Sequence, residues 1–336
     1  MRSITRFIKS LIWSGFLLVA ACAAGLYYYA HDELRLETSP VTFELRVGSS
    51  LRNVATQLAK AGVIGRPELF ELLARALGES AKLKAGNYEF SAPLTPLSLL
   101  QQMTRGDVAL LAVTFVEGST FRQMRKALQD NPKIRAETAA MTETELLEKL
   151  EIPQPRGEGW FFPDTYHFSA GTSDLAILRR ANRLMLHYLN QEWERRAPGL
   201  PLKSPMEALI LASIVEKETG KPEERGMVAA VFINRLRIGM LLQTDPTVIY
   251  GMGESFDGNI RRGDLTTDTP YNTYTRAGLP PTPIAMPGLE ALRATLNPAP
   301  SNALYFVARG DGTSKFSRTL TEHERAVTQY QRRGRK

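Results

Sequence analysis

The feature that most constrains this chain is a run of about 21 residues near the N-terminus without a charged side chain. The run covers residues 10–30, between Lys9 and His31, and reads SLIWSGFLLVAACAAGLYYYA. An α-helix of this length, rising about 1.5 Å per residue, crosses the roughly 30 Å hydrocarbon layer of a bilayer. We therefore expect residues 10–30 to form a single transmembrane helix.

The charges on either side of this run predict its orientation. Three basic side chains lie within residues 1–9, whereas Asp32 and Glu33 follow the run. The positive-inside rule keeps the basic side of a membrane helix in the cytoplasm. We therefore expect a single-pass protein of the inner membrane, with a cytoplasmic N-terminus at residues 1–9 and the remainder of the chain in the periplasm.

Two other interpretations of the same run remain open. A cleaved signal peptide needs a small-residue cleavage site followed by a polar mature start, but the small residues around Cys22 are followed by more apolar sequence. The segment Val19–Cys22 also resembles a lipoprotein cleavage box, in which Cys22 would carry the lipid. A polar tether normally follows such a cysteine, whereas here the chain continues as Gly25–Tyr29. The pattern favours an uncleaved anchor.

Charge and composition exclude several classes of function. The net charge of +7 comes from three basic residues before Asp32 and four after Tyr330, so the part between them is neutral. It lacks the basic stripe that phosphate binding needs, and we expect no nucleic-acid partner. A single Cys cannot form a disulfide within the chain. With four His and no CxxC or HExxH motif, a structural metal site is not expected either.

Residues 41–130 contain a weak internal repeat at an offset of 70 residues. Val47–Val54 reads VGSSLRNV and Glu117–Met124 reads EGSTFRQM. In each copy alternating apolar residues predict a strand, the glycine permits a turn, Ser or Thr can cap a helix, and apolar residues then recur at helical spacing. Such strand–turn–helix units resemble LysM-like modules, which hold N-acetyl sugars in a shallow groove. A packing unit without a ligand explains the same pattern equally well.

The rest of the chain predicts helices with a few short strands, so the fold class we expect is α+β. The segment from Gly239 to Pro287 has few periodic runs and is about twice as long as loops without secondary structure usually are, which is typical of a functional region. Helices are expected over residues 137–150, 176–193, 206–219 and 223–237, followed by a helix that opens at Pro287 and strands over residues 303–308 and 314–319.

The helix expected over residues 206–219 carries the strongest candidate for an acid. At about 100° per residue its apolar stripe runs along Leu211 and Val215, and Glu218 falls inside that stripe. A carboxyl group among apolar neighbours loses hydration when it ionises, so its pKa rises toward the range in which it can protonate a leaving oxygen. In a simpler interpretation, the helix ends near Glu218 and the side chain reaches water or pairs with Arg225.

The segment after this helix brings amides, hydroxyls and aromatic rings into one non-repetitive region. Residues 242–251, 271–274 and 278–281 contain the side chains that a sugar site uses, with aromatic rings to stack on the apolar face of a sugar. Each motif taken alone is weak evidence. Asn272 is more often a turn residue than a ligand, and Gln243–Pro246 more often begins a helix or a turn than forms a site.

Five segments form longer motifs: LASIVEKET at 211–219, FINRLRIGMLLQTDPTVIYG at 232–251, YNTY at 271–274, GLPP at 278–281 and EGWFFPDTY at 158–166. Together they resemble the YceG-like (MltG) family of endolytic murein transglycosylases. The resemblance covers nearly the whole chain, including the N-terminal anchor and the LysM-like region. It implies a mixed α+β catalytic domain over residues 155–332.

The resemblance also implies roles for individual residues. In that family the catalytic acid and base is the second Glu of the EKE triplet, which here is Glu218, the residue that helical phase selects independently. Gln243, Tyr250, Asn272 and Tyr274 fall in the family's other patterned segments and are expected to line the glycan cleft. No metal or cofactor is implied.

The implied reaction is cleavage of the MurNAc–GlcNAc β-1,4 bond within a nascent peptidoglycan strand. Glu218 would protonate the leaving GlcNAc O4 and then accept the proton of the MurNAc O6 hydroxyl as O6 closes on C1, which leaves a 1,6-anhydro end. The implied partners are peptidoglycan strands and the glycosyltransferases, among them penicillin-binding proteins, whose strand elongation such cleavage would end.

Two other functions fit the sequence. A hydrolytic muramidase would use a second carboxylate to activate water, for which Asp245 is the candidate. A non-catalytic peptidoglycan-binding scaffold of the cell-wall synthesis machinery would bind glycan through residues 41–130 and cleave nothing. Reducing ends on the products would indicate the muramidase, and binding without cleavage would indicate the scaffold.

Overall fold

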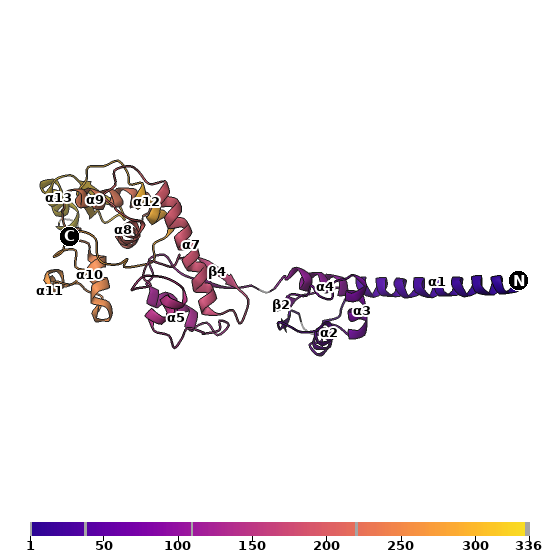
Figure 1. Cartoon of the computed structure of the whole chain (residues 1–336). Coiled ribbons are helices and arrows are strands. Elements are labelled where there is room, and N and C mark those ends of the chain that lie inside the picture. The colour runs from indigo at the N-terminus through magenta and orange to yellow at the C-terminus, as the bar shows by residue number, and fades with distance from the viewer. Residues whose placement is uncertain (1, 37–38, 109, 219–220, 333–336) are drawn as a thin grey trace. The chain divides into compact units, whose positions relative to one another are not determined.

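The computed structural model describes residues 2–36, 39–108, 110–218 and 221–332. The chain forms two compact units, Met1–Leu111 with His167–Ala170, and Ala112–Tyr166 with Gly171–Lys336. Helices and a short antiparallel sheet occur in each unit (Figure 1), so the expected α+β class is confirmed.

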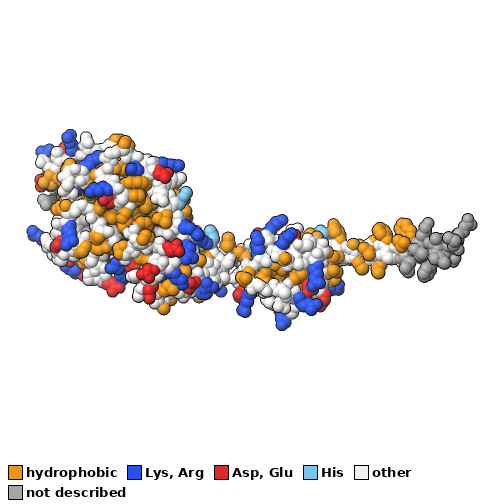
Figure 2. Space-filling view, viewed as in Figure 1, with side chains coloured by type: hydrophobic (Ala, Val, Ile, Leu, Met, Phe, Trp, Pro, Cys, Tyr) orange, Lys and Arg blue, Asp and Glu red, His pale blue; other side chains and the backbone are white. Residues whose placement is uncertain are grey.

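The N-terminal helix α1 (Arg2–His31) confirms the helix expected over residues 10–30 and extends it toward the N-terminus. Its segment Ile12–His31 is long and apolar enough to cross a membrane, with a mean hydropathy of 1.5 and none of its most apolar stretch buried. Figure 2 shows hydrophobic side chains projecting along this helix. The last turn differs from the rest, because Ala30 is 4% exposed and lies in the core of the first unit.

The first unit is built on an antiparallel pair, β1 (Val41–Leu45) and β2 (Gly86–Phe90). Helices α2 (Leu51–Lys60), α3 (Pro67–Ala76) and α4 (Pro96–Arg105) complete it. The strand, turn and capped helix that the first copy of the repeat predicts are confirmed. Alternation buries one face of β1, and the Ser50 hydroxyl accepts a hydrogen bond from the Asn53 N–H at the start of α2.

The second copy of the repeat has the same local structure. β3 (Leu111–Thr114) leads through a turn to α5 (Phe121–Gln129), where Thr120 and Gln123 form a reciprocal capping box. β3 pairs with β4 (Thr165–Phe168). The first copy lies in the first unit and the second copy lies in the second unit. The region 41–130 therefore contains elements of both units.

One helix is shorter than the sequence predicts. The segment expected to be helical over residues 137–150 forms α6 only over Glu143–Lys149. The reason lies in Asp174, a 1% exposed carboxylate at the start of α7 (Asp174–Glu194). Its oxygens accept hydrogen bonds of 2.7–3.2 Å from the N–H groups of Glu137 and Thr138 and from the Thr138 hydroxyl. These bonds hold residues 137–138 outside the helix.

The remaining elements of the second unit follow α7 along the chain. They are α8 (Pro205–Glu218), α9 (Arg225–Arg237), α10 (Asp245–Met252), α11 (Arg262–Thr266), α12 (Leu289–Leu296), β5 (Tyr305–Ala308), β6 (Ser314–Ser317) and α13 (Leu320–Val327), with 3-10 turns at Pro222–Glu224 and Gly253–Ser255 and a π-helical turn at Thr328–Arg332. β5 and β6 form an antiparallel hairpin. The segment 239–287, which shows few periodic runs, contains the short helices α10 and α11.

The central helix of this unit is α8, which packs against α7, α9 and α12 (Figure 1). All residues from Ala208 to Val215 are at most 5% exposed, because neighbouring elements cover the helix on all sides. The expectation of one apolar stripe and one solvent-facing side is therefore wrong for this helix. Its buried hydroxyl, that of Ser213, is satisfied by donating to the Ile210 carbonyl at 2.7 Å and accepting from the Ile284 N–H at 3.0 Å.

Replacing Asp174 tests how residues 137–138 are held. Asp174→Ala leaves the N–H groups of these residues without their acceptor, so we expect the free energy of unfolding to fall by about 2–4 kcal/mol. Asp174→Asn keeps one oxygen acceptor and is expected to lose less. Chemical denaturation followed by the fluorescence of Trp160 and Trp193 measures both values. An unchanged midpoint in Asp174→Ala would show that these bonds do not stabilise the unit.

Candidate active site

The last turn of α8 carries three adjacent charged residues that meet different surroundings. The Glu216 side chain is 7% exposed, and its carboxylate accepts the Gly288 N–H at 2.9 Å and pairs with Arg225 at 3.6 Å. Lys217 is exposed, and its Nζ donates to a backbone carbonyl 3.2 Å away. Within the described part of the chain, Arg225 thus pairs with Glu216 rather than with Glu218.

Glu218, the predicted acid, is partly buried at the end of α8. The Thr244 hydroxyl donates a hydrogen bond to its carboxyl oxygen. Burial raises the pKa of Glu218, and the nearby Asp245 carboxylate acts in the same direction, while the Thr244 hydrogen bond and the Arg235 guanidinium lower it. Burial is the largest of these effects, so the carboxyl keeps its proton to a higher pH than a glutamate in water does.

Thr244 is held in place by a buried group of three threonines. It is the N-cap residue of α10, and its N–H donates to the Thr273 hydroxyl at 3.1 Å. The Thr247 hydroxyl donates to the Thr244 carbonyl at 2.7 Å, and its oxygen lies 2.9 Å from Thr273 Oγ1. All three residues are at most 2% exposed. The hydroxyl that contacts Glu218 is therefore positioned by the start of α10.

Neither Thr244 nor Arg235 stands out in the sequence, although both act on Glu218. Arg235 on α9 is 8% exposed, and its guanidinium donates to two backbone carbonyls, each 2.7 Å away. Burial lowers the pKa of Arg235, which the nearby Glu218 carboxylate raises. A sequence signal for Thr244 does exist, because the pair Asp245–Pro246 is typical of a helix start and makes the preceding residue the N-cap.

A second carboxyl group, that of Asp245, lies near Glu218. Asp245 is the first residue of α10, and its Oδ1 accepts a 2.5 Å hydrogen bond from the Tyr274 hydroxyl. Burial raises the pKa of Tyr274, and the carboxylates of Asp245 and Glu218 raise it further. The structure thus gathers two carboxyls, a threonine hydroxyl, a phenol and a guanidinium where α8, α9 and α10 meet. Among the described residues, no three His, Cys, Asp or Glu side chains are grouped to hold a metal ion.

Gln243 and Asn272 take different places at this site. Gln243 is exposed, and its φ of 49° is a left-handed conformation that residues other than glycine seldom adopt. Asn272 is 1% exposed. Its amide nitrogen donates to the carbonyls of residues 264, 265 and 267 at 2.7–3.2 Å, and its oxygen accepts the Tyr274 N–H at 2.9 Å. Asn272 therefore shapes the loop that carries Tyr274.

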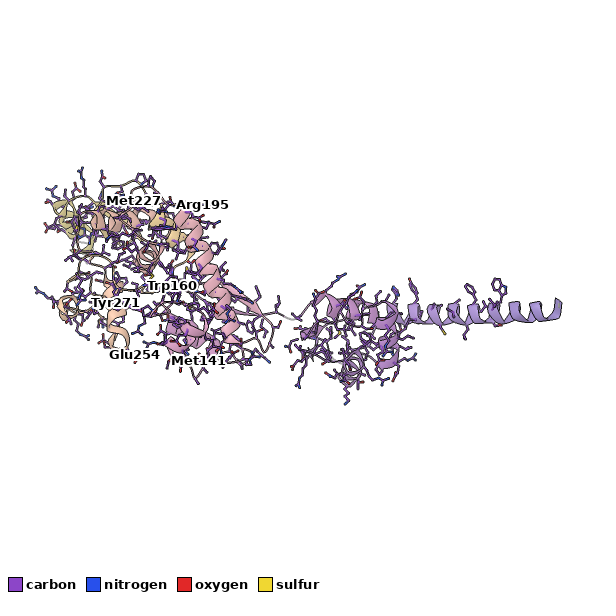
Figure 3. All side chains as sticks on the ribbon, in the orientation of Figure 1. Met141, Trp160, Arg195, Met227, Glu254 and Tyr271 are labelled. Carbon is purple, nitrogen blue, oxygen red and sulfur yellow. The ribbon has the colours of Figure 1, made fainter. Side chains whose placement is uncertain are left out.

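Tyr250 makes its polar contact with a different buried acid, Glu158. The Tyr250 hydroxyl hydrogen-bonds to the Glu158 carboxyl, and its ring packs edge-on against Tyr271 (labelled in Figure 3), with the centroids 4.9 Å apart. Glu158 is 5% exposed and accepts the Phe121 N–H at 3.0 Å. Burial raises the pKa of Glu158 to about 7, even though both hydrogen bonds lower it. In the sequence, Glu158 is only the first residue of a longer motif.

Two cavities are present in the second unit. The larger, of about 410 Å³, is lined by residues 114–119, by one face of α5 and by Lys217. The other, of about 380 Å³, is lined by residues 164–166 and by α7. Glu218 lines neither of the two. Because Lys217 directly precedes Glu218, the larger cavity adjoins the last turn of α8 on a neighbouring face.

A family model described as YceG-like matches residues 43–329. The chain belongs to the YceG-like family. This confirms the family that the motifs around Glu218 indicate, and it places both described units within one YceG-like region.

Individual relatives agree with this assignment. A protein of Bacillus subtilis (strain 168) named endolytic murein transglycosylase is 30% identical over 312 residues, which cover 86% of this chain and 84% of that protein. A protein of the same name from Streptococcus pneumoniae (strain D39) is 28% identical, and the match covers 96% of this chain and 65% of that protein. A crystal structure of a YceG-like protein from Listeria monocytogenes is similar with a TM-score of 0.54 and 29% identity, covering 86% of this chain and 99% of that one.

Removing the Thr244 hydroxyl tests its effect on Glu218 in this YceG-like chain. The hydrogen bond from Thr244 favours the ionised carboxyl, and Thr244→Val removes it while keeping the size of the side chain. We expect the pKa of Glu218 to be higher in Thr244→Val than in wild type, as measured by carbon-13 NMR titration of the carboxyl carbons with Glu218→Gln for assignment. The exposed Thr266→Val is the matched control, and an unchanged pKa in Thr244→Val would contradict the contact.

Glu158 makes the free energy of unfolding depend on pH. Its pKa is about 7 in the folded chain, against 4.5 for an ordinary glutamate. A buried acid with a raised pKa stabilises the fold most below its unfolded pKa, and this contribution is lost as the pH rises through the folded pKa. At about 1.4 kcal/mol per pKa unit, wild type loses on the order of 3 kcal/mol across this window that Glu158→Gln does not lose.

Urea denaturation at intervals between about pH 5 and about pH 8 measures this difference. The free energy of unfolding of Glu158→Gln, relative to wild type, should rise steadily with pH. Glu254→Gln, at an exposed carboxyl, controls for the general effect of removing one negative charge. A difference between Glu158→Gln and wild type that stays constant with pH would contradict a raised pKa for Glu158.

Proposed function

We propose that this chain is an endolytic murein transglycosylase that uses Glu218 as its catalytic acid and base. The observation that supports this most directly is the Glu218 carboxyl, which ends a buried helix, has a pKa raised by burial and accepts a hydrogen bond from a fixed Thr244 hydroxyl. Relatives that cover most of the chain carry the name of this activity. The substrate we infer is the peptidoglycan strand.

Both proton transfers of this reaction run through one carboxyl. Protonated Glu218 donates to GlcNAc O4 as the bond between that oxygen and MurNAc C1 breaks. The carboxylate then accepts the proton of the MurNAc O6 hydroxyl while O6 forms its bond to C1, so Glu218 ends protonated as it began. The intramolecular hydroxyl has the proximity advantage of a tethered nucleophile. The products are a free GlcNAc O4 hydroxyl and a 1,6-anhydro end.

The surroundings of Glu218 suit both forms that this cycle needs. Burial favours the protonated form, which must exist before the glycosidic bond breaks. The Thr244 hydrogen bond and the Arg235 guanidinium favour the carboxylate that exists after it. A carboxyl with burial alone would release its proton reluctantly, and one with a cation alone would lose it at neutral pH. The opposing effects fit a group that both gives and takes a proton.

We also propose that Gln243, Tyr250, Asn272 and Tyr274 form the wall of the glycan cleft. Gln243 is exposed beside Thr244, and the Tyr274 hydroxyl is bonded at the start of α10, so these two are placed to contact a sugar near the reacting carboxyl. Asn272 and Tyr250 fit a supporting role, since the first is buried in its loop and the second is bonded to a buried acid.

Hydrolysis is the second candidate, because another carboxyl lies near Glu218. Asp245 is exposed, accepts the Tyr274 hydroxyl and raises the pKa of Glu218. As a base it would take a proton from a water molecule that attacks MurNAc C1, as in an ordinary glycosidase. A muramidase leaves reducing ends, a transglycosylase leaves 1,6-anhydro ends, and a non-catalytic scaffold leaves the strands uncut.

The location we infer is the inner membrane, with residues 10–30 as a single-pass anchor, residues 1–9 in the cytoplasm and the folded units in the periplasm. The apolar helix α1 and the basic residues before it support this orientation. We assign catalysis to residues 155–332 and glycan holding to a LysM-like subdomain over residues 41–130. The partners we infer are peptidoglycan glycosyltransferases, including penicillin-binding proteins, because their nascent strands emerge at the same membrane.

Glu218→Gln tests the proposed activity. The substitution removes the transferable proton while nearly preserving the shape of the side chain. We expect the release of anhydro-ended fragments from purified glycan strands to fall by about 100-fold or more, with cooperative unfolding retained. Mass spectrometry of the digestion products gives both the amount and the type of end, since anhydro and reducing ends differ by one water.

Glu223→Gln is the matched control, because Glu223 is exposed, lies shortly after α8 and receives the same substitution. It should cut glycan at the wild-type rate. Full activity in Glu218→Gln would refute the role of Glu218. Reducing ends in place of anhydro ends would select the muramidase, and wild-type protein that binds strands without cutting them would select the scaffold.

A further inference from the structure

Glu158 is a buried acid that the proposed reaction does not use. Its carboxyl has two partners on elements that are far apart in the sequence. It accepts the N–H of Phe121, the first residue of α5, at 3.0 Å, and it is hydrogen-bonded to the hydroxyl of Tyr250 on α10. At 5% exposure the carboxyl is shielded from water, so these bonds are not weakened by competition with solvent.

The turn that carries Glu158 is fixed on both sides. A Cβ atom at Gly157 would lie 2.7 Å from the Phe121 ring, and one at Gly159 would lie 2.5 Å from the Pro283 side chain. The backbone therefore lies directly against both neighbours. Gly159 also has a φ of +84°, which favours glycine. The Glu158 carboxyl has little freedom to move away from its partners.

Tyr250 and Thr244 lie toward opposite ends of α10. Thr244 caps the start of the helix and donates to Glu218, while Tyr250 lies about 9 Å further along at 1.5 Å per residue. The Tyr250 ring packs against Tyr271, whose hydroxyl lies 2.8 Å from Thr282 Oγ1. Because α10 has only 8 residues, holding it at Tyr250 restricts where its first residues lie.

Two charged groups act on Glu158 from the elements around it. Glu143, at the start of α6, raises the pKa of its carboxyl by repulsion, and Arg122 on α5 lowers it by attraction. Arg122 also forms an ion pair with Glu254, just after α10 (labelled in Figure 3). These two side chains are 69% and 84% exposed, and such exposed pairs contribute little to stability. The same two elements thus have one buried link and one exposed link.

We propose that Glu158 is a positioning residue for the proposed reaction. Its carboxyl fastens Tyr250 on α10 to the start of α5, and in this way it sets where Thr244 meets the carboxyl of Glu218. Its effect on the reaction rate rests on the proposed function, whereas its anchoring of α10 does not. Glu158 acts through α10 and touches no substrate.

The kinetic test uses the full chain with glycan strands as substrate. A small misplacement of groups at the reacting centre costs up to about 100-fold in rate, so we expect kcat in Glu158→Ala to fall about 10-fold or more while KM stays within about twofold. Glu158→Gln keeps an oxygen for the Phe121 N–H and should recover most of kcat. Arg122→Gln removes only the exposed link and should leave kcat within about twofold of wild type.

Hydrogen exchange tests the anchoring without reference to activity. In Glu158→Ala, the amides of Asp245–Met252 should exchange faster than in wild type, while those of α8 should not change. If wild type cleaves no glycan, the proposed function fails and this measurement alone decides whether Glu158 holds α10. Unchanged exchange in α10, or a Glu158→Ala variant with wild-type kcat, would overturn the inference.

A second variant covers the case in which Glu158→Ala does not fold. Tyr250→Phe removes one hydroxyl and leaves the ring packed against Tyr271. If Tyr250 only contacts sugar, its loss raises KM and leaves the exchange of α10 unchanged. If it links Glu158 to α10, its loss lowers kcat and accelerates exchange in α10. A wild-type kcat in Tyr250→Phe would contradict the proposal.

Discussion

The burial of α8 is the constraint on which the rest of the second unit depends. Because other elements cover this helix on every side, a charged side chain can be accommodated only in its last turn. Glu216 and Glu218 both lie there, and burial raises the pKa of each. Two carboxyls at the edge of an apolar interior need polar partners, and residues from later segments of the chain supply them.

The two carboxyls receive partners of different kinds. Glu216 has a guanidinium and a backbone N–H, both of which only donate, so its surroundings favour a permanent anion. Glu218 has the hydroxyl of Thr244, which can donate to a carboxylate and can also accept from a protonated carboxyl. Its nearest partner therefore suits either protonation state. This difference, rather than burial as such, distinguishes a structural acid from a candidate catalytic one.

Local structure could be predicted from the sequence, because its signals lie within a few residues. The alternation in β1 and the Ser50 cap of α2 are examples. The helix expected over residues 137–150 was predicted too long, because the Asp174 carboxylate, from a distant segment, holds residues 137–138 instead. Helical phase placed Glu216 at the edge of a stripe, yet its side chain is only 7% exposed, because phase assumes a solvent-facing side that α8 lacks. Thr244 and Arg235 reach Glu218 through tertiary packing, which no local pattern encodes.

The way α1 joins the first unit has a geometric consequence. Ala30 is already part of that unit's core, and the Leu34 N–H donates to the Leu94 carbonyl at 2.8 Å, so no flexible leash separates the helix from the fold. With α1 in a bilayer, the first unit stands at a constant height above the lipid headgroups. Glycan that has moved outward into older layers of the wall lies beyond its reach, and only strands still close to the membrane surface can meet it.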